Sequence, residues 1–172
     1  KMANFAIMGF GTVGSGVAEV LRMNADSIAA KLGEPLKLKY ILDVRDLSAT
    51  PYAGVAVKDF SVLENDPDLD VVVESIGGAK VALDFTRRAL MAGKHVVTSN
   101  KELVASHGKE LLSIAREKNV NYLFEASVGG GIPVLRPLFQ CLAGNQIEEI
   151  VGILHGTTSY ILTRMGRGRI PF

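Results

Sequence analysis

A glycine-rich turn near the start of the chain could bind a phosphate group. The pattern G-x-G-x-x-G is made by Gly9, Phe10, Gly11, Thr12, Val13 and Gly14. In such a pattern Gly9 permits a tight turn, Gly11 lets the backbone approach a pyrophosphate, and Gly14 lets the helix pack closely on the preceding strand. The free N–H groups and the positive end of the following helix also favour a diphosphate. The pattern predicts a dinucleotide site, while the alternative is a turn with a structural role alone.

Two charged residues after the second predicted strand could select the type of dinucleotide. Asp43 lies further from the glycine pattern than the usual spacing of about 20 residues, which a long first helix would explain. Its carboxylate would accept hydrogen bonds from ribose hydroxyls and favour NAD. Arg45 could instead pair with a 2′-phosphate and favour NADP. Both could also be solvated charges at a strand end, so these residues leave the choice between NAD and NADP open.

Two further loops follow apolar strand candidates. Their residues are Ser75, Ile76 and Gly77 in the first loop, and Thr98, Asn100 and Lys101 in the second. Ligands of open α/β sheets bind outside the carboxyl ends of the strands, so we expect these loops to lie beside the nicotinamide ribose. Lys101 could steer a hydride reaction by binding an oxygen of the cofactor or the substrate. The alternative is an exposed lysine at the start of a helix.

The elements that would position these residues alternate along the chain. Strands are expected over residues 5–8, 36–42, 70–74, 95–98 and 121–125, with a possible short strand at 55–57. Helices are expected from residue 13 to about 21, over 79–91 and over 102–118, while residues 24–35 are interpreted as a helix end and loop. Strands separated by helices of this length imply right-handed βαβ units and a parallel sheet covered on both faces. The prediction is a doubly wound, Rossmann-type α/β domain over residues 1–126.

The pattern changes after residue 126. A glycine run precedes a predicted helix over 134–142, a predicted strand over 147–154 and a final predicted helix over 159–165. The apolar faces of these elements would lack partner layers within the chain. We therefore interpret residues 127–172 as the beginning of a second, incomplete α+β domain.

Composition excludes several other classes of protein. The 172 residues include 19 Lys and Arg against 18 Asp and Glu, and 48% are hydrophobic, which indicates a globular core without a basic surface for nucleic acid or membranes. The single cysteine, Cys141, can form neither an internal disulfide nor a multi-cysteine metal site, and its position within a helix does not suit a nucleophile. No apolar run reaches the roughly 18 residues of a membrane span. We expect a soluble, cytoplasmic protein.

Several blocks of the sequence resemble homoserine dehydrogenase. They cover residues 9–17, 44–47, 95–101, 125–133 and 152–162, and the last two are more specific than the glycine pattern. That family reduces aspartate 4-semialdehyde to homoserine with NADPH or NADH, on the route to threonine and methionine. The resemblance therefore implies an oxidoreductase with a Rossmann-type cofactor domain. A non-catalytic dinucleotide-binding module and a different NAD(P)-dependent amino-acid or semialdehyde dehydrogenase are the alternatives.

The resemblance also implies roles for individual residues. It assigns Lys101 to the junction of cofactor and substrate, where its charge would stabilise a developing alkoxide as a catalytic residue. It assigns Arg45 to the 2′-phosphate and Ser75 to the nicotinamide side. It further implies a monovalent-cation site for Na⁺ or K⁺, built largely from backbone carbonyls, at Glu125, Val128, Gly130 and Ile132. The alternative for Glu125 is a carboxylate that caps the following helix through its N–H groups.

Two departures from the family pattern affect the expected activity. His155 and Ser159 stand where the family has asparagines, which puts substrate positioning or assembly in doubt. The substrate-binding acids and second lysine of the family have no counterpart here, since no lysine follows Lys118. We expect a truncated form that binds cofactor but turns over poorly, and that self-associates as a homo-oligomer through exposed apolar surface.

Overall fold

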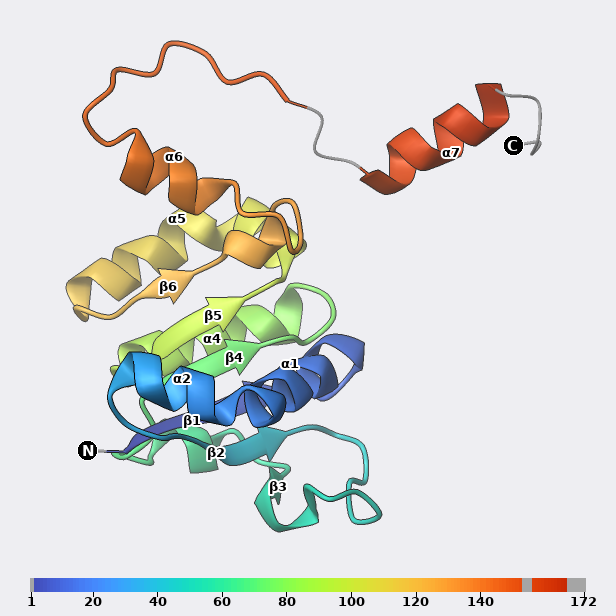
Figure 1. Ribbon diagram of the computed structural model, residues 1–172. Helices are drawn as coiled ribbons and strands as arrows, with labels where there is room; N and C mark the ends of the chain where they lie inside the picture. Colours follow the sequence, from blue (N-terminus) through green and yellow to red (C-terminus); the bar gives the residue numbers. More distant parts are fainter. Residues whose placement is uncertain (1, 153–155, 167–172) are drawn as a thin grey trace.

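The computed structural model describes residues 2–152 and 156–166, and a six-stranded parallel sheet forms its centre (Figure 1). The strands are β1 Ala3–Met8, β2 Leu36–Leu42, β3 Ala56–Val57, β4 Val71–Glu74, β5 His95–Thr98 and β6 Tyr122–Leu123. They lie in the order β3-β2-β1-β4-β5-β6, and each neighbouring pair is parallel. The chain therefore builds outward from β1 in both directions, and the predicted doubly wound α/β fold is confirmed.

Helices cover both faces of this sheet (Figure 1). They are α1 Thr12–Met23, α2 Ala25–Leu32, α3 Ser61–Glu64, α4 Lys80–Met91 and α5 Lys101–Glu117, with short 3₁₀ turns at Ala53–Val55 and Glu125–Ser127. Alternation along β1 sends Phe5 and Ile7 into the core beneath α1, and Ala6 and Met8 into the core beneath α4 and α5. Among the described residues, no helix has both the length and the apolar character needed to cross a membrane.

The segment between α1 and β2 differs from the prediction. Residues 24–35 were expected to be a helix end and loop, but α2 forms there and ends at Gly33 in a left-handed conformation. The apolar residues of this helix do recur at helical spacing, at Ala25, Ile28, Ala29 and Leu32, but none of its residues is fully buried. A second, solvent-facing helix explains the long separation between the glycine pattern and Asp43 better than one extended helix does.

The part of the chain after residue 126 forms helices but no strand among its described residues. Helix α6 spans Leu135–Cys141 and α7 spans Gly156–Gly166, which confirms the two predicted helices. The strand predicted over 147–154 is wrong for residues 147–152, since they pair with no other strand and Ile150 and Val151 are exposed. The β-branched residues Ile147, Ile150 and Val151 do not make a strand without an edge to pair with, and Glu148 and Glu149 interrupt their apolar run. Residues 153 and 154 lie outside the described residues, and the domain boundary at 126 stays a prediction.

Candidate dinucleotide site

The glycine turn joins β1 to α1 at the carboxyl edge of the sheet. Gly9 has a positive φ of 87°, and its N–H donates to the Leu42 carbonyl at 2.8 Å. A Cβ at Gly9 would lie 2.8 Å from the Ser75 carbonyl oxygen, and a Cβ at Gly14 would lie 2.0 Å from the Gly9 carbonyl oxygen. Both positions therefore require glycine, for backbone conformation at one and for close approach at both.

The N-terminus of α1 fits an anionic ligand. Its N-cap, Gly11, makes no side-chain cap, and the first turn contains no acidic residue. The first N–H groups of a helix have no acceptor within the helix, so their partial positive charge is available here. A Cβ built on Gly11 meets no atom within 4 Å, which leaves space for a phosphate group to approach the backbone. Gly11, Thr12 and Val13 can therefore contribute their backbone to a diphosphate site.

Asp43 fastens this turn to the end of β2. Its carboxylate accepts from the Phe10 N–H at 2.6 Å, and from the Arg45 backbone N–H, Nε and Nη2 at 2.8, 2.9 and 2.8 Å. The Arg45 side chain, together with the two backbone N–H groups, holds the pKa of Asp43 well below its usual range despite burial of the carboxyl. A carboxylate offers about four acceptor positions, and these four donors occupy them. The interaction of Asp43 with ribose hydroxyls stays a prediction, since it would have to displace one of these donors.

Arg45 lies at the rim of the same end of the sheet. Its side chain is 56% exposed, and its pairing with Asp43 sets the orientation of the guanidinium. Two of its nitrogens donate to Asp43, while the fork geometry leaves further N–H donors for an anion. Lys58 was not among the predicted site residues, and its ammonium group donates to the Val44 carbonyl at 2.7 Å and to the Arg45 carbonyl. The rim therefore carries two cations beside the phosphate turn.

The loop after β4 is bonded to the glycine turn. The Ser75 hydroxyl donates to the Gly9 carbonyl oxygen at 2.7 Å, and the Ser75 N–H donates to the Met8 carbonyl at 2.9 Å. The structure thus brings Ser75, Ile76 and Gly77 beside the turn, although the serine hydroxyl is already used within the protein. Its proposed contact with the nicotinamide side remains a prediction.

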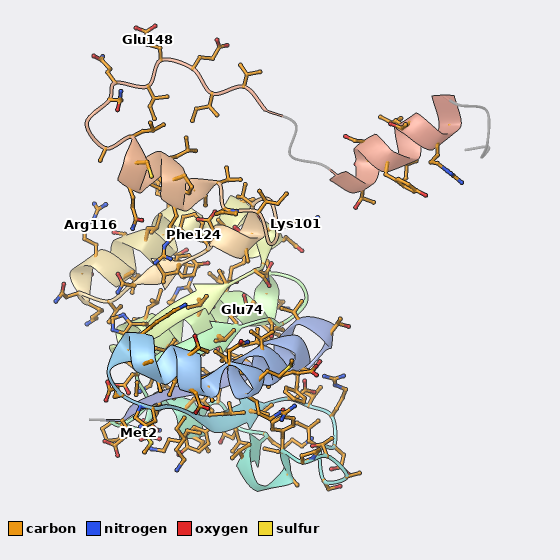
Figure 2. The ribbon with its side chains drawn as sticks, in the orientation of Figure 1. Met2, Glu74, Lys101, Arg116, Phe124 and Glu148 are labelled. Carbon is orange, nitrogen blue, oxygen red and sulfur yellow. The ribbon has the colours of Figure 1, made fainter. Side chains whose placement is uncertain are left out.

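The loop after β5 leads directly into Lys101. Thr98 is buried at the end of β5, and its Oγ1 accepts from the Asn100 N–H at 2.9 Å. The Asn100 carboxamide caps α5 by accepting from the Leu103 N–H at 3.1 Å. Lys101 is the first residue of α5 and is exposed (Figure 2). The structure therefore gathers the predicted residues of both loops at the same edge as the glycine turn.

Lys101 borders a hollow of about 1060 Å³. Its other walls are Ser99 and Ala105, the glycine-rich segment 126–132, and the start of α7 at Gly156, Thr157 and Thr158. The hollow is open to solvent and lies beside the carboxyl edge of the sheet. Lys101 forms part of its wall, and the predicted contact of this lysine with a substrate stays a prediction.

Glu125 acts as the cap of α6. Its carboxylate accepts from the backbone N–H groups of Val134, Leu135 and Arg136, the last two at 2.9 and 2.7 Å. These N–H groups hold the pKa of Glu125 below its ordinary value. The Glu125 carboxylate therefore caps the start of α6. Among the described residues, no group of three or more His, Cys, Asp or Glu side chains could hold a metal ion. A cation at Glu125, Val128, Gly130 and Ile132 would have to use mainly backbone carbonyls, and it stays a prediction.

Replacing Glu125 by glutamine should loosen the start of α6. One amide oxygen cannot accept all three N–H groups, so we expect the Leu135 and Arg136 amides to exchange hydrogen roughly tenfold faster. Hydrogen-exchange NMR measures this directly. Glu148→Gln, in the exposed segment after α6, is the matched control (Figure 2). Unchanged exchange at both amides in Glu125→Gln would show that the cap does not hold the helix.

Glu74 is the most deeply buried acid of the site and was not among the predicted site residues. It lies within the strand predicted over 70–74, and nothing in the spacing pointed to its partners. A signal was present nonetheless, since a carboxylate that ends an otherwise apolar buried strand needs hydrogen-bond donors. The location of those donors depends on the strand register, which places Glu74 opposite Thr98.

A doubly wound parallel sheet with a glycine turn at its carboxyl edge defines a Rossmann-type dinucleotide-binding domain, and comparisons with known proteins agree. Residues 9–125 match the family model "Homoserine dehydrogenase, NAD binding domain", and residues 133–172 match the model "Homoserine dehydrogenase". The chain therefore belongs to the homoserine dehydrogenase family, and its main domain is an NAD(P)-binding domain.

Individual relatives support the same assignment. Homoserine dehydrogenase of Neisseria gonorrhoeae is 41% identical over 96% of this chain and 38% of its own length, and that of Bacillus subtilis is 40% identical over 100% and 40%. The crystal structure of a homoserine dehydrogenase from Thiobacillus denitrificans has a TM-score of 0.87 at 39% identity, covering 96% of this chain and 39% of that one. A hyperthermophilic archaeal homoserine dehydrogenase in complex with NADPH has a TM-score of 0.82 at 27% identity, covering 99% and 58%. The chain spans about 38–40% of the length of these curated relatives.

Proposed function

We propose that this chain carries the NADP(H)-binding part of a cytoplasmic homoserine dehydrogenase, which interconverts aspartate 4-semialdehyde and homoserine on the route to threonine and methionine. The observation that carries the proposal is the convergence of the glycine turn, Arg45 and Lys101 on one edge of the sheet in a chain of this family. The NADPH complex of the archaeal relative supports the choice of cofactor class.

NADP(H) rather than NAD(H) suits the charges at the rim. The acceptor positions of Asp43 are taken up by Phe10 and Arg45, which leaves little capacity for ribose hydroxyls. The exposed Arg45 guanidinium offers charge-assisted hydrogen bonds to a 2′-phosphate, and the Lys58 ammonium group, bonded to the Arg45 carbonyl, adds a second positive charge at the rim. The N-terminus of α1 would hold the diphosphate, and the loops after β4 and β5 would border the nicotinamide half.

The chemistry of the reaction fits the residues near Lys101. The bound cofactor would supply the hydride that converts the aldehyde to an alkoxide, which a proton from solvent would convert to the alcohol. The Lys101 ammonium group would stabilise the negative charge that develops on the carbonyl oxygen, and the polar start of α7 would face the substrate across the hollow. A monovalent cation held by the carbonyls of the 125–132 segment, and burial of the exposed apolar residues of α6 and α7 against a second copy, complete the proposal.

Two measurements on this chain test the proposal separately. We expect NADPH to bind with a dissociation constant in the range of about 1–100 μM, followed by its fluorescence, and to bind more tightly than NADH. Homoserine-dependent reduction of NADP⁺ is expected to be slow or absent. If the chain binds NADPH but catalyses no reaction, the result would support the interpretation that this chain by itself is a dinucleotide-binding module. Failure to bind either cofactor would refute the proposal.

A further inference from the structure

Glu74 is a fully buried carboxylate at the point where two cofactor-side loops meet. It is the last residue of β4, has no exposed surface, and lies opposite Thr98 at the end of β5 (Figure 2). Burial raises the pKa of the Glu74 carboxyl above its ordinary value, even though the hydrogen bonds it accepts act in the opposite direction. A carboxylate placed here is costly to the fold unless both of its oxygens are used.

Each oxygen of Glu74 serves a different loop. Its Oε1 accepts from the Ile76 N–H at 2.7 Å, in the loop after β4. Its Oε2 accepts from the Thr98 hydroxyl at 2.5 Å, and that hydroxyl oxygen in turn accepts from the Asn100 N–H. The carboxylate therefore joins the loop that borders the glycine turn to the segment that starts α5.

Asn100 closes the connection from the other side. Its Nδ2 donates to the Ile76 carbonyl at 3.1 Å and to the Gly78 carbonyl at 2.8 Å, while its Oδ1 caps α5 at Leu103. The result is a ring of hydrogen bonds that runs from Glu74 through both loops and returns to Ile76. Lys101 follows Asn100 directly, so this ring fixes the backbone from which the Lys101 side chain projects.

Glu74 makes no hydrogen bond to the other buried polar group near it in the described part of the chain, the Tyr122 hydroxyl. The hydroxyl of Tyr122 is buried on the same side of the sheet and has no hydrogen-bond partner in the described part of the chain. Burial and the nearby Glu74 charge raise the pKa of Tyr122. Glu74 is thus close enough to influence this hydroxyl electrostatically, yet its hydrogen bonds go to the two loops.

We propose that Glu74 is a positioning residue that locks the 75–78 loop and the start of α5 into one unit, so that Lys101 keeps a fixed place relative to a bound dinucleotide. The effect on Lys101 rests on the proposed function, because it requires the cofactor beside the 75–78 loop. The hydrogen-bonded connection between the two loops is a property of the protein without ligand. The connection and its effect on cofactor binding can therefore be tested independently.

Glu74→Gln tests the lock with little change of shape. In the glutamine variant the Thr98 hydroxyl can no longer donate to a carboxylate oxygen and has to turn round to accept from the new NH2 group, while the contact to the Ile76 N–H loses its charge assistance, so the connection between the two loops is weakened. Glu64→Gln is the matched control, because Glu64 pairs with Arg88 at the other end of α4 from this loop. Hydrogen exchange is read at Ile76 and Leu103, with Ile7 in the centre of the sheet as the internal reference.

In the free protein we expect hydrogen exchange at the Leu103 amide to be about tenfold faster in Glu74→Gln, while exchange at the Ile7 amide is unchanged. In Glu64→Gln we expect exchange at both of these amides to be unchanged. NADPH should slow Ile76 and Leu103 together in the unmodified chain, but only Ile76 in Glu74→Gln. Unchanged protection of Leu103, with both loops still responding together, would overturn the proposal. If Glu74→Gln does not fold, Thr98→Val breaks the same ring from the other side and carries the same expectation. Failure of the unmodified chain to bind NADPH would remove the function, and exchange in the free protein would still decide the lock.

Discussion

Gly14→Ala is expected to weaken NADPH binding by at least about 100-fold and to destabilise the fold by about 3 kcal/mol. The added Cβ would lie 2.0 Å from the Gly9 carbonyl oxygen and 2.9 Å from the Ser75 hydroxyl oxygen. The first of these atoms is backbone, so the turn itself has to move, and the hydrogen bond between Ser75 and Gly9 moves with it. Fluorescence titration with NADPH and urea denaturation measure the two effects.

Gly16→Ala is the control for this experiment. Gly16 lies in the same helix, and a Cβ there meets no atom within 4 Å. Alanine should stabilise the helix by about 0.5–1 kcal/mol and leave NADPH affinity nearly unchanged. Similar losses of affinity in both variants would show that α1 tolerates no change at all, and the argument from close approach at Gly14 would fail.

Arg45→Ala is expected to raise the dissociation constant for NADPH by about 10- to 100-fold and to change that for NADH by less than about twofold. The guanidinium would contribute charge-assisted hydrogen bonds to the 2′-phosphate, a group that NADH lacks. Asp43 would keep its hydrogen bond from Phe10, so the glycine turn should retain its shape. Titrations with both cofactors at one fixed ionic strength give the ratio.

Arg116→Ala, in the last turn of α5 and far from the glycine turn, controls for a general loss of positive charge (Figure 2). It should affect both cofactors equally and weakly. Equal losses of NADPH and NADH affinity in Arg45→Ala would instead mean that Arg45 acts through Asp43 and the turn. Arg45 would then not be the residue that distinguishes the two cofactors.

The parts of the fold that could be predicted from sequence are those set by local patterns. The continuous apolar run from Phe5 to Met8 indicates a strand buried on both faces, and the valines before Glu74 mark another. The prediction was wrong for α2, although its apolar residues recur at helical spacing, and for residues 147–152, whose β-branched residues find no strand to pair with. The first error comes from the very short break between α1 and α2, where Asn24 ends one helix and begins the next. The second arises because tertiary partners decide whether a strand forms.

The candidate site was also predictable only where local patterns determine it. Its residue types could be predicted from the glycine spacing and from the loops at strand ends, whereas the partners of each side chain could not. Ser75 was expected beside the nicotinamide, and its hydroxyl is bonded to Gly9. Glu74 was not selected, because its partner Thr98 is fixed by a strand register that spacing along the chain does not encode.

The bonds that hold the glycine turn have a consequence for the thermodynamics of ligand capture. Asp43 fixes one side of the turn and Ser75 the other, and neither interaction involves a ligand. The turn is therefore ordered when the domain folds, and little conformational entropy remains to be lost when a dinucleotide arrives. Affinity should then reflect the contacts themselves, with association closer to docking on a rigid surface than to folding around the ligand.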